Sequence, residues 1–182
     1  MSGTLRQDAS LGLRYGVVEV VEYRPEWMEL GERLTARVAA LLGSRATAVA
    51  HIGSTSVPGL AAKPIIDVAV RLVPDAVLDN LVAVLSGDGW IYRGDAGDDG
   101  GQVFVSETQP WLRVAHIHAI AHDDPQFDRY LAVRDRLRAN PEAVARYSAL
   151  KRELARRFPA DRKAYTAGKT DFITDLLAHT EP

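Results

Sequence analysis

The segment HIGSTSVPGLAAKPIIDVAV, residues 51–70, indicates most about the fold and chemistry of this 182-residue chain. It predicts the end of one strand, a tight Gly-Ser turn, a constrained loop and a second strand that begins near Asp67. A Gly-Ser turn can present backbone N–H groups and a hydroxyl to a phosphate. A carboxylate at the start of the next strand can hold a divalent metal beside that phosphate. Each feature alone is ordinary turn chemistry, but their combination with Lys63 predicts a phosphate site with a metal.

Hydrophobic patterns outside this segment predict an α+β domain. Period-two or continuous apolar runs predict strands over residues 17–22, 46–52, 65–72, 89–93, 102–107 and 112–120. Helical spacing, with prolines at the breaks, predicts helices over residues 25–42, 74–86, 125–139, 141–158 and 161–178. We therefore expect a flexible N-terminus over residues 1–16 and one domain over residues 17–178, with an α/β core at 17–122 and a helical part at 125–178.

Composition excludes several classes of protein. The chain has no cysteine, which rules out disulfides and thiolate metal sites. It has no apolar run near 18 residues and no signal-peptide core, so we expect no membrane span and a cytoplasmic location. The net charge of −2 and an isoelectric point near 6.2 make nucleic acid an unlikely partner. The glycine-rich acidic stretch at residues 94–101 is typical of a flexible loop.

The turn and the Asp67 strand resemble the signature of the GrpB family, small bacterial proteins with a nucleotidyltransferase-like fold of the polymerase-β type. The resemblance continues in YRPEW at residues 23–27 and RVAHIH at residues 113–118. Further matching residues lie in the helical part: Arg134-Asp135, Tyr147, Leu150-Lys151, Tyr165, Gly168-Lys169 and Phe172-Ile173. It covers residues 17–178 and implies a mixed β-sheet with flanking helices and a C-terminal helical segment.

The resembled fold also implies a metal site at Asp67. Enzymes of the polymerase-β type usually carry a second carboxylate two residues later on the same strand face, where this chain has Ala69. Two-metal phosphoryl transfer needs several carboxylates, so the site binds one metal, uses other ligands, or binds nucleotide without turnover. His116 and His118 share one strand face and are the replacement candidates, and His51 could join them. Imidazoles favour Zn or Mn over Mg, so Mg, Mn and Zn all stay open; the alternative is hydrogen bonding of the histidines in a polar core.

Three predicted helices each carry a cation on the face that should point inward. Arg134, Lys151 and Lys169 lie on apolar stripes, and Tyr147 and Tyr165 lie one turn from the two lysines. Residues 129–169 contain twelve Arg or Lys against four Asp or Glu. Long stems that reach solvent are one explanation, but isolated buried charge is costly, and three such cations suggest a shared anionic partner.

These observations predict an enzyme that binds ATP or another nucleoside triphosphate. Gly53, Ser54 and Thr55 would cradle the phosphates, and Asp67, His116 and His118 would hold the metal. The side chains expected to neutralise or contact the phosphates are Lys63, Arg113, Arg134, Lys151, Lys169, Tyr147 and Tyr165. The reaction would transfer a nucleotidyl group to a small acceptor or activate a carboxylate, with Trp111 and the 94–101 loop near the acceptor.

Two alternatives remain open at this point. A catalytically degenerate accessory protein would keep the phosphate pocket without turnover. Because some relatives of the GrpB type are fused to dephospho-CoA kinase, its role would be linked to nucleotides or CoA. A metal-dependent hydrolase built on the histidine pair is the second alternative, since fold alone does not decide function.

Overall fold

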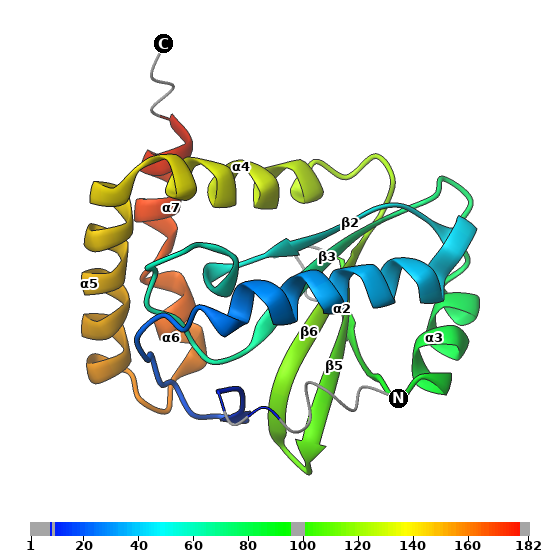
Figure 1. The fold of residues 1–182 in the computed structure, drawn as a ribbon, viewed down its shortest axis with the longest axis horizontal. Helices are drawn as coiled ribbons and strands as arrows, with labels where there is room; N and C mark the ends of the chain where they lie inside the picture. Colours follow the sequence, from blue (N-terminus) through cyan, green and yellow to red (C-terminus); the bar gives the residue numbers. More distant parts are fainter. Residues whose placement is uncertain (1–7, 9, 96–100, 179–182) are drawn as a thin grey trace.

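The computed structural model describes residues 8, 10–95 and 101–178, and Figure 1 shows a mixed sheet with helices around it. The strands are β1 Leu13–Arg14, β2 Ala46–Ile52, β3 Ile66–Leu72, β4 Ile91–Asp95, β5 Gln102–Gln109 and β6 Leu112–Ile120. The helices are α2 Glu26–Leu42, α3 Leu78–Gly87, α4 Gln126–Ala139, α5 Pro141–Arg157, α6 Arg162–Ala167 and α7 Thr170–Ala178. Two 3₁₀ turns, η1 Gly43–Arg45 and η2 Ser54–Ser56, flank β2. The predicted α+β class is confirmed.

The six strands of the described residues form one sheet in the order β2-β3-β6-β5-β4, and β1 pairs with the start of β6. The β3–β6 pair is parallel, whereas β2–β3, β5–β6 and β4–β5 are antiparallel. Strand β3 lies inside the sheet between β2 and β6, and Val68, Ala69 and Val70 are fully buried, as its apolar run predicts. In the β3–β6 register, His116 lies beside Asp67 and His118 beside Ala69.

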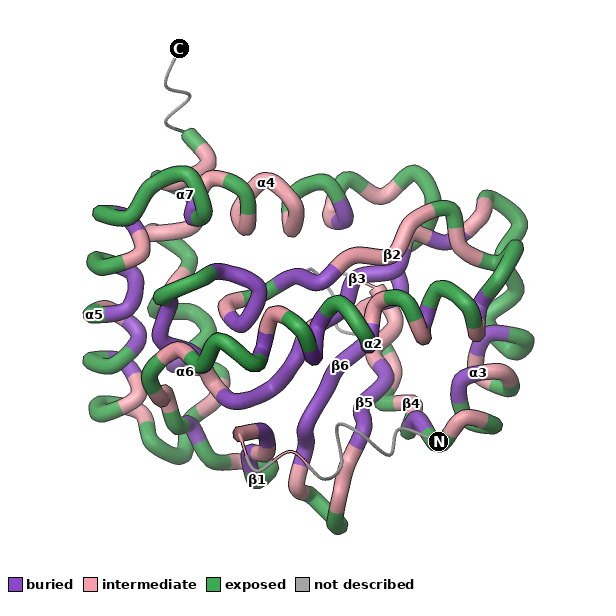
Figure 2. The backbone as a smooth tube through the Cα atoms, viewed as in Figure 1, coloured by how far each residue is buried: buried purple, intermediate pink, exposed green. Residues whose placement is uncertain are grey.

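The two faces of the sheet are covered by different helices. Figure 1 shows α2 lying along one face, where Trp27 and Leu34 pack in the same core cluster as Val68 and Ile117. A smaller cluster, which joins Ala69 and Ile120 to Phe127 of α4, covers the opposite face. Because strand side chains alternate between faces, Asp67 and Ala69 belong to the α4 face of β3. Figure 2 shows β3 and β6 as largely buried, whereas α2 and α4 carry both buried and exposed residues.

Helices α5, α6 and α7 gather at the end of the sheet where the loop after β2 lies (Figure 1). Asn140 caps α5 by accepting from the N–H of Ala143 at 2.9 Å, and Pro141 occupies its first turn. Val57 and Leu60 of the loop form a core cluster with residues of α4 and α5, including Tyr147. The N–H of Ala61 also donates to Ser148 of α5 at 3.1 Å. The helical part therefore packs directly against the predicted phosphate loop.

Two predicted elements differ in the structure. Residues 17–22 do not form a strand: the N–H of Val18 donates to the carbonyl of Pro159, and Val21 forms only an isolated bridge with Ala62. Their backbone bonds go to loops instead of a strand ladder. The predicted helix over residues 161–178 is divided into α6 and α7 at Gly168, where the backbone packs so closely that an added Cβ would lie 2.5 Å from Leu154.

Part of the segment predicted to be a flexible N-terminus, residues 11–16, takes part in the fold. Residues 1–7 and 9 lie outside the described residues, but Leu11 and Leu13 are buried and Leu13–Arg14 forms β1. The predicted 94–101 loop lies mostly outside the described residues. Of the helices that the structure describes, none combines the length and apolar character needed to cross a membrane.

Candidate functional site

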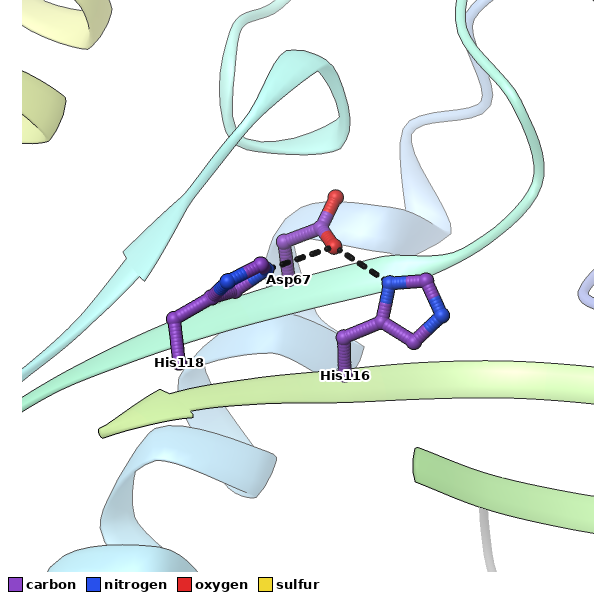
Figure 3. Close-up of side chains that lie close together, drawn as sticks. All are labelled: Asp67, His116 and His118. Atoms are coloured by element: carbon purple, nitrogen blue, oxygen red, sulfur yellow. Dashed lines mark hydrogen bonds and ion pairs between the residues drawn. The ribbon is translucent and has the colours of Figure 1, made fainter. Parts of the chain in front are cut away.

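Asp67, His116 and His118 converge on the α4 face of the sheet (Figure 3). Nδ1 of His116 lies 3.0 Å from Oδ1 of Asp67, and Nε2 of His118 lies 3.6 Å from the same oxygen. One ligand atom from each of the three residues lies within 4.8 Å of the others, which suits a single divalent ion. The parallel β3–β6 register produces this arrangement, because it sets His116 directly beside Asp67.

The electrostatics of this cluster favour a charged carboxylate at Asp67. Burial alone would raise the pKa of Asp67, but the contacts and charges of the two histidines outweigh it and hold that pKa well below its usual value. Burial lowers the pKa of His116, against the opposing effect of Asp67. Nε2 of His116 and Nδ1 of His118 have no hydrogen-bond partner among the described residues. Because an ionised Asp67 can only accept, its 3.0 Å bond to His116 places a proton on Nδ1 of that ring.

The donor set also fits a metal. Two imidazoles and one carboxylate are ligands for Zn, Mn or Fe more than for Mg. The Asp67 side chain is 27% exposed, so solvent and ligands can reach it. Tyr130 lies next to the cluster, with its ring 5.6 Å from that of His118, and it was not among the predicted site residues.

The Gly53–Ser54 turn lies against this cluster. Gly53 has φ 71°, and a Cβ added there would lie 2.8 Å from Oδ2 of Asp67, so a side chain would both strain the backbone and press on the carboxylate. On the other side of the turn, Nζ of Lys151 donates to Oγ of Ser54 at 2.8 Å. Gly53 and Ser54 keep solvent access, as a phosphate-binding turn requires.

Three lysines and two tyrosines form a second cluster beside the turn, which we call the lysine cluster. Nζ of Lys151 lies 4.6 Å from the ring centre of Tyr147, and Lys63 and Lys169 lie 5.4 and 4.9 Å from that of Tyr165. Lys151 is only 2% exposed, and no described carboxylate forms a salt bridge with Lys63 or Lys151. Buried cations without a carboxylate are stabilised when an anion binds.

The pKa values in the lysine cluster reflect the same crowding of charge. Burial, reinforced by neighbouring cations, lowers the pKa of Lys151 well below its usual value. Burial and the charge of Lys169 lower the pKa of Lys63 to about 8, while the charge of Asp67 acts in the opposite direction. Burial raises the pKa of both tyrosines, so they remain neutral phenols. The charge of Asp67 therefore acts on Lys63, which links the two clusters electrostatically.

Two arginines of α4 hold the loop from outside. Arg134 donates to the carbonyl of His51 at 3.1 Å, and Arg138 donates twice to the carbonyl of Ser56, at 2.9 and 2.7 Å. Arg134 also pairs with Asp135. The prediction had included Arg134 as a phosphate ligand but had missed Arg138, which follows it at the i, i+4 spacing of one helix face. Both arginines fix the backbone that enters and leaves the Gly-Ser turn.

Three predicted residues lie apart from the metal-type cluster. His51 opposes Val68 and faces α2, where a Cβ on Gly31 would lie 2.0 Å from its ring, so it is on the wrong face of the sheet to join Asp67. Its Nε2 bonds Thr55 Oγ1 at 3.1 Å, which occupies that hydroxyl. Arg113 pairs with Glu107 at 3.5 Å, and its guanidinium lies 4.4 Å from the ring centre of Tyr15. The geometry thus corrects the suggested role of His51 as a metal ligand.

The mixed sheet, the flanking helices and the carboxylate beside a Gly-Ser turn define a nucleotidyltransferase-like α+β protein. The family model for GrpB protein matches residues 17–179. The chain therefore belongs to the GrpB family, as the sequence resemblance predicted.

Known relatives agree with this assignment. The crystal structure of the conserved protein GrpB from Enterococcus faecalis is 35% identical, covers 88% of this chain and 95% of that one, and gives a TM-score of 0.77. The glutamate-rich protein GrpB of Alkalihalophilus pseudofirmus is 30% identical over 92% of this chain and 98% of its own length. A Mycolicibacterium paratuberculosis protein named dephospho-CoA kinase is 31% identical over 87% of this chain and 44% of its own.

Some relatives are much longer than the matched region. The UPF0157 protein YqkA of Bacillus subtilis is 31% identical over 86% of this chain, which spans 45% of that protein. A Pseudomonas aeruginosa UPF0157 protein is 35% identical over 88% of this chain, which spans 66% of it. The chain thus corresponds to a part of these proteins.

Proposed function

We propose that this chain binds a nucleoside triphosphate with one divalent metal and transfers its nucleotidyl group to a small acceptor. One observation carries the proposal: the Gly53–Ser54 turn touches Asp67 on one side and Lys151 on the other. A triphosphate on this turn would have a metal-type cluster at one end and buried cations at the other. The similarity to proteins named dephospho-CoA kinase supports a link to nucleotides.

Each cluster has a distinct role in this proposal. Asp67, His116 and His118 would hold the metal, which supplies positive charge to the phosphate oxygens when bound. The lysine cluster would neutralise the remaining phosphate charge, so catalysis would depend on positioning and electrostatics. An acceptor oxygen would form a bond to the α-phosphorus. The bond between the α-phosphorus and the oxygen that bridges it to the β-phosphate would break, so that pyrophosphate leaves while the acceptor proton passes to solvent.

Titration calorimetry tests this proposal directly. The protein is titrated with ATP, GTP and CTP in the presence of Mg, Mn or Zn and without metal. We expect one nucleotide to bind with Mn or Zn and Asp67→Asn to abolish that binding, while the exposed control Asp75→Asn behaves as the wild type. Pyrophosphate release is measured in parallel. If no nucleotide binds under any of these conditions, the proposal is wrong.

A nucleotide-linked accessory protein is the second candidate, and Ala69 favours it. Ala69 is fully buried beside His118, where a further carboxylate would be expected in an active enzyme of the resembled type. This candidate predicts nucleotide binding without pyrophosphate release under any metal. A metal-dependent hydrolase, favoured by the two-histidine donor set, predicts instead hydrolysis of a phosphate ester with Mn or Zn and no nucleotide requirement.

A further inference from the structure

Tyr15 and Trp111 form an exposed aromatic pair at the edge of the molecule where β1 meets the β5–β6 turn. They are 53% and 55% exposed, and their ring centres lie 5.7 Å apart at 44°. Large aromatic side chains that remain this exposed often mark binding sites. We call the surface formed by Tyr15, Arg93, Trp111 and Arg162, with the buried guanidinium of Arg113 against the Tyr15 ring, the aromatic platform.

The protein holds Trp111 in place at a conformational cost. Its φ of 68° is the only positive value at a non-glycine position among the described residues, and such backbone is costly for a bulky side chain. Its N–H donates to Oε2 of Glu107 at 2.9 Å, and its carbonyl accepts from the N–H of Tyr15 at 2.8 Å. These bonds hold the backbone of Trp111 so that its indole ring faces solvent. Because the ring stays exposed, it buries little apolar surface, and folding stability does not explain its position.

Guanidinium groups surround the two rings. Those of Arg113 and Arg162 lie 4.4 and 5.2 Å from the ring centre of Tyr15, and that of Arg93 lies 5.4 Å from the Trp111 ring. Glu107 is the carboxylate that pairs with Arg93 and Arg113, at 3.1 and 3.5 Å. Within the described part of the chain, no salt bridge involves Arg162. Three cations share one carboxylate, so the platform is positively charged.

The platform is continuous with the lysine cluster. The N–H of Gly12 donates to the carbonyl of Pro64 at 2.9 Å, so the chain that leads to Tyr15 runs beside Lys63. Helix α6 carries both Arg162 and Tyr165, and the Tyr165 ring lies under Lys63. The charges of Arg162 and Arg113 also contribute to the lowered pKa of Lys63, after burial and Lys169.

We propose that the aromatic platform binds the acceptor of the transfer reaction and that this acceptor is a small anionic molecule with a planar ring; the acceptor role rests on the proposed function. A planar ring would stack on the exposed aromatic side chains, and the arginines would hold the acid group. The platform offers one pair of rings and the chain has net charge −2, which favours a small molecule over a nucleic-acid strand.

Phenyl phosphate and cyclohexyl phosphate are matched probes, because they have the same acid group but only the first has an aromatic ring. Trp27 and Trp90 are 0% and 3% exposed, so a fluorescence change on binding reports on Trp111. We expect phenyl phosphate to bind at least tenfold more tightly than cyclohexyl phosphate and to change the fluorescence. Equal affinity for the two probes would overturn the proposal.

Variants of the full chain are then compared by titration calorimetry. Trp111→Asn accepts the left-handed backbone, and we expect it to weaken phenyl phosphate binding at least tenfold. Arg162→Gln should weaken it at least threefold, whereas Arg129→Gln on the exposed side of α4 should have no effect. Unchanged binding in Trp111→Asn would refute the platform as the site. Tighter binding of a thymidine oligonucleotide than of phenyl phosphate would refute the small-molecule assignment.

A separate titration keeps the two proposals distinguishable. Tripolyphosphate with Mn tests the Gly53–Ser54 site without ring stacking on the platform, because it has no ring. If tripolyphosphate binds but the protein binds phenyl phosphate and cyclohexyl phosphate equally well, the platform inference fails and the proposed function remains. If tripolyphosphate and the nucleotides do not bind but phenyl phosphate does, the platform is a binding site and its acceptor role fails.

Discussion

His51 provides a prediction that separates a structural histidine from a metal ligand. Its ring is 6% exposed, packs against Gly31 of α2 and bonds Thr55 through Nε2. Burial lowers the pKa of His51 from 6.5 to about 4, although the charge of Asp67 acts in the opposite direction. The folded protein therefore holds this imidazole neutral.

The size of the effect follows from linkage between proton binding and unfolding. Between pH 6.5 and pH 4, the unfolded chain protonates His51 while the folded chain does not, so stability is complete above pH 6.5 and falls as the pH decreases. With these two pKa values, His51 alone removes about 2 kcal/mol of unfolding free energy between pH 7 and pH 5. Other groups titrate over the same range, so the effect must be measured as a difference.

The comparison uses the wild type and His51→Gln, which keeps a polar group near Thr55 but does not titrate. Urea unfolding gives the free energy of unfolding of both proteins at pH 7 and pH 5. The loss of stability between these pH values should be about 2 kcal/mol larger in the wild type than in His51→Gln. Because His51 faces α2, Zn or Mn affinity should be unchanged in His51→Gln and at least tenfold weaker in His116→Gln. Equal pH sensitivity in the two proteins, or loss of metal binding in His51→Gln, would refute the argument.

Three further predictions concern the turn and the lysine cluster. Gly53→Ala should lower the unfolding free energy by about 1–3 kcal/mol, because position 53 has a left-handed backbone and an added Cβ would press on Asp67. The control Gly87→Ala should not destabilise the protein, because no atom lies within 4 Å of a Cβ added there. Equal urea unfolding midpoints for the two variants would contradict this. Lys151→Met should raise stability by about 1–3 kcal/mol and weaken tripolyphosphate binding at least tenfold by calorimetry; unaltered tripolyphosphate affinity would exclude Lys151 from the site. Lys63 has a pKa of about 8, so its amine is charged at lower pH and neutral at higher pH. Tripolyphosphate affinity should therefore fall between pH 7 and pH 9 in the wild type and fall less in Lys63→Met. Identical pH profiles of affinity in the two proteins would contradict this.

Much of the fold could be predicted because its signals are local. The Gly-Ser turn, the apolar β3 strand and the prolines at the starts of α4 and α5 are each signals within a few residues. The pairing of His116 and His118 with Asp67 also followed from sequence, but only together with the resembled fold. Period two places both histidines on one strand face, and the parallel register that brings this face to Asp67 depends on tertiary structure.

The errors have a common physical origin in contacts between distant segments. The face that His51 occupies depends on the β2–β3 register, which sets Ile52 opposite Asp67, and no local pattern specifies it. Leu13–Arg14 forms a strand only because β6 offers a partner edge. The break at Gly168 follows from its close approach to Leu154 on another helix. Sequence periodicity contains no information about such long-range packing.

The replacement of a carboxylate by histidine changes what the site can do. With Ala69 beside His118, strand β3 supplies one carboxylate, and β6 supplies imidazoles that are neutral when they bind a metal. The ligand set then has a charge of −1, so a divalent ion would leave a net positive site beside the buried lysines. Such a site would bind a highly charged anion such as a triphosphate strongly but would release its products slowly. The proposed nucleotide binding follows from this geometry more directly than rapid turnover does, and the ratio of pyrophosphate release to bound nucleotide is the quantity that would separate an enzyme from an accessory protein.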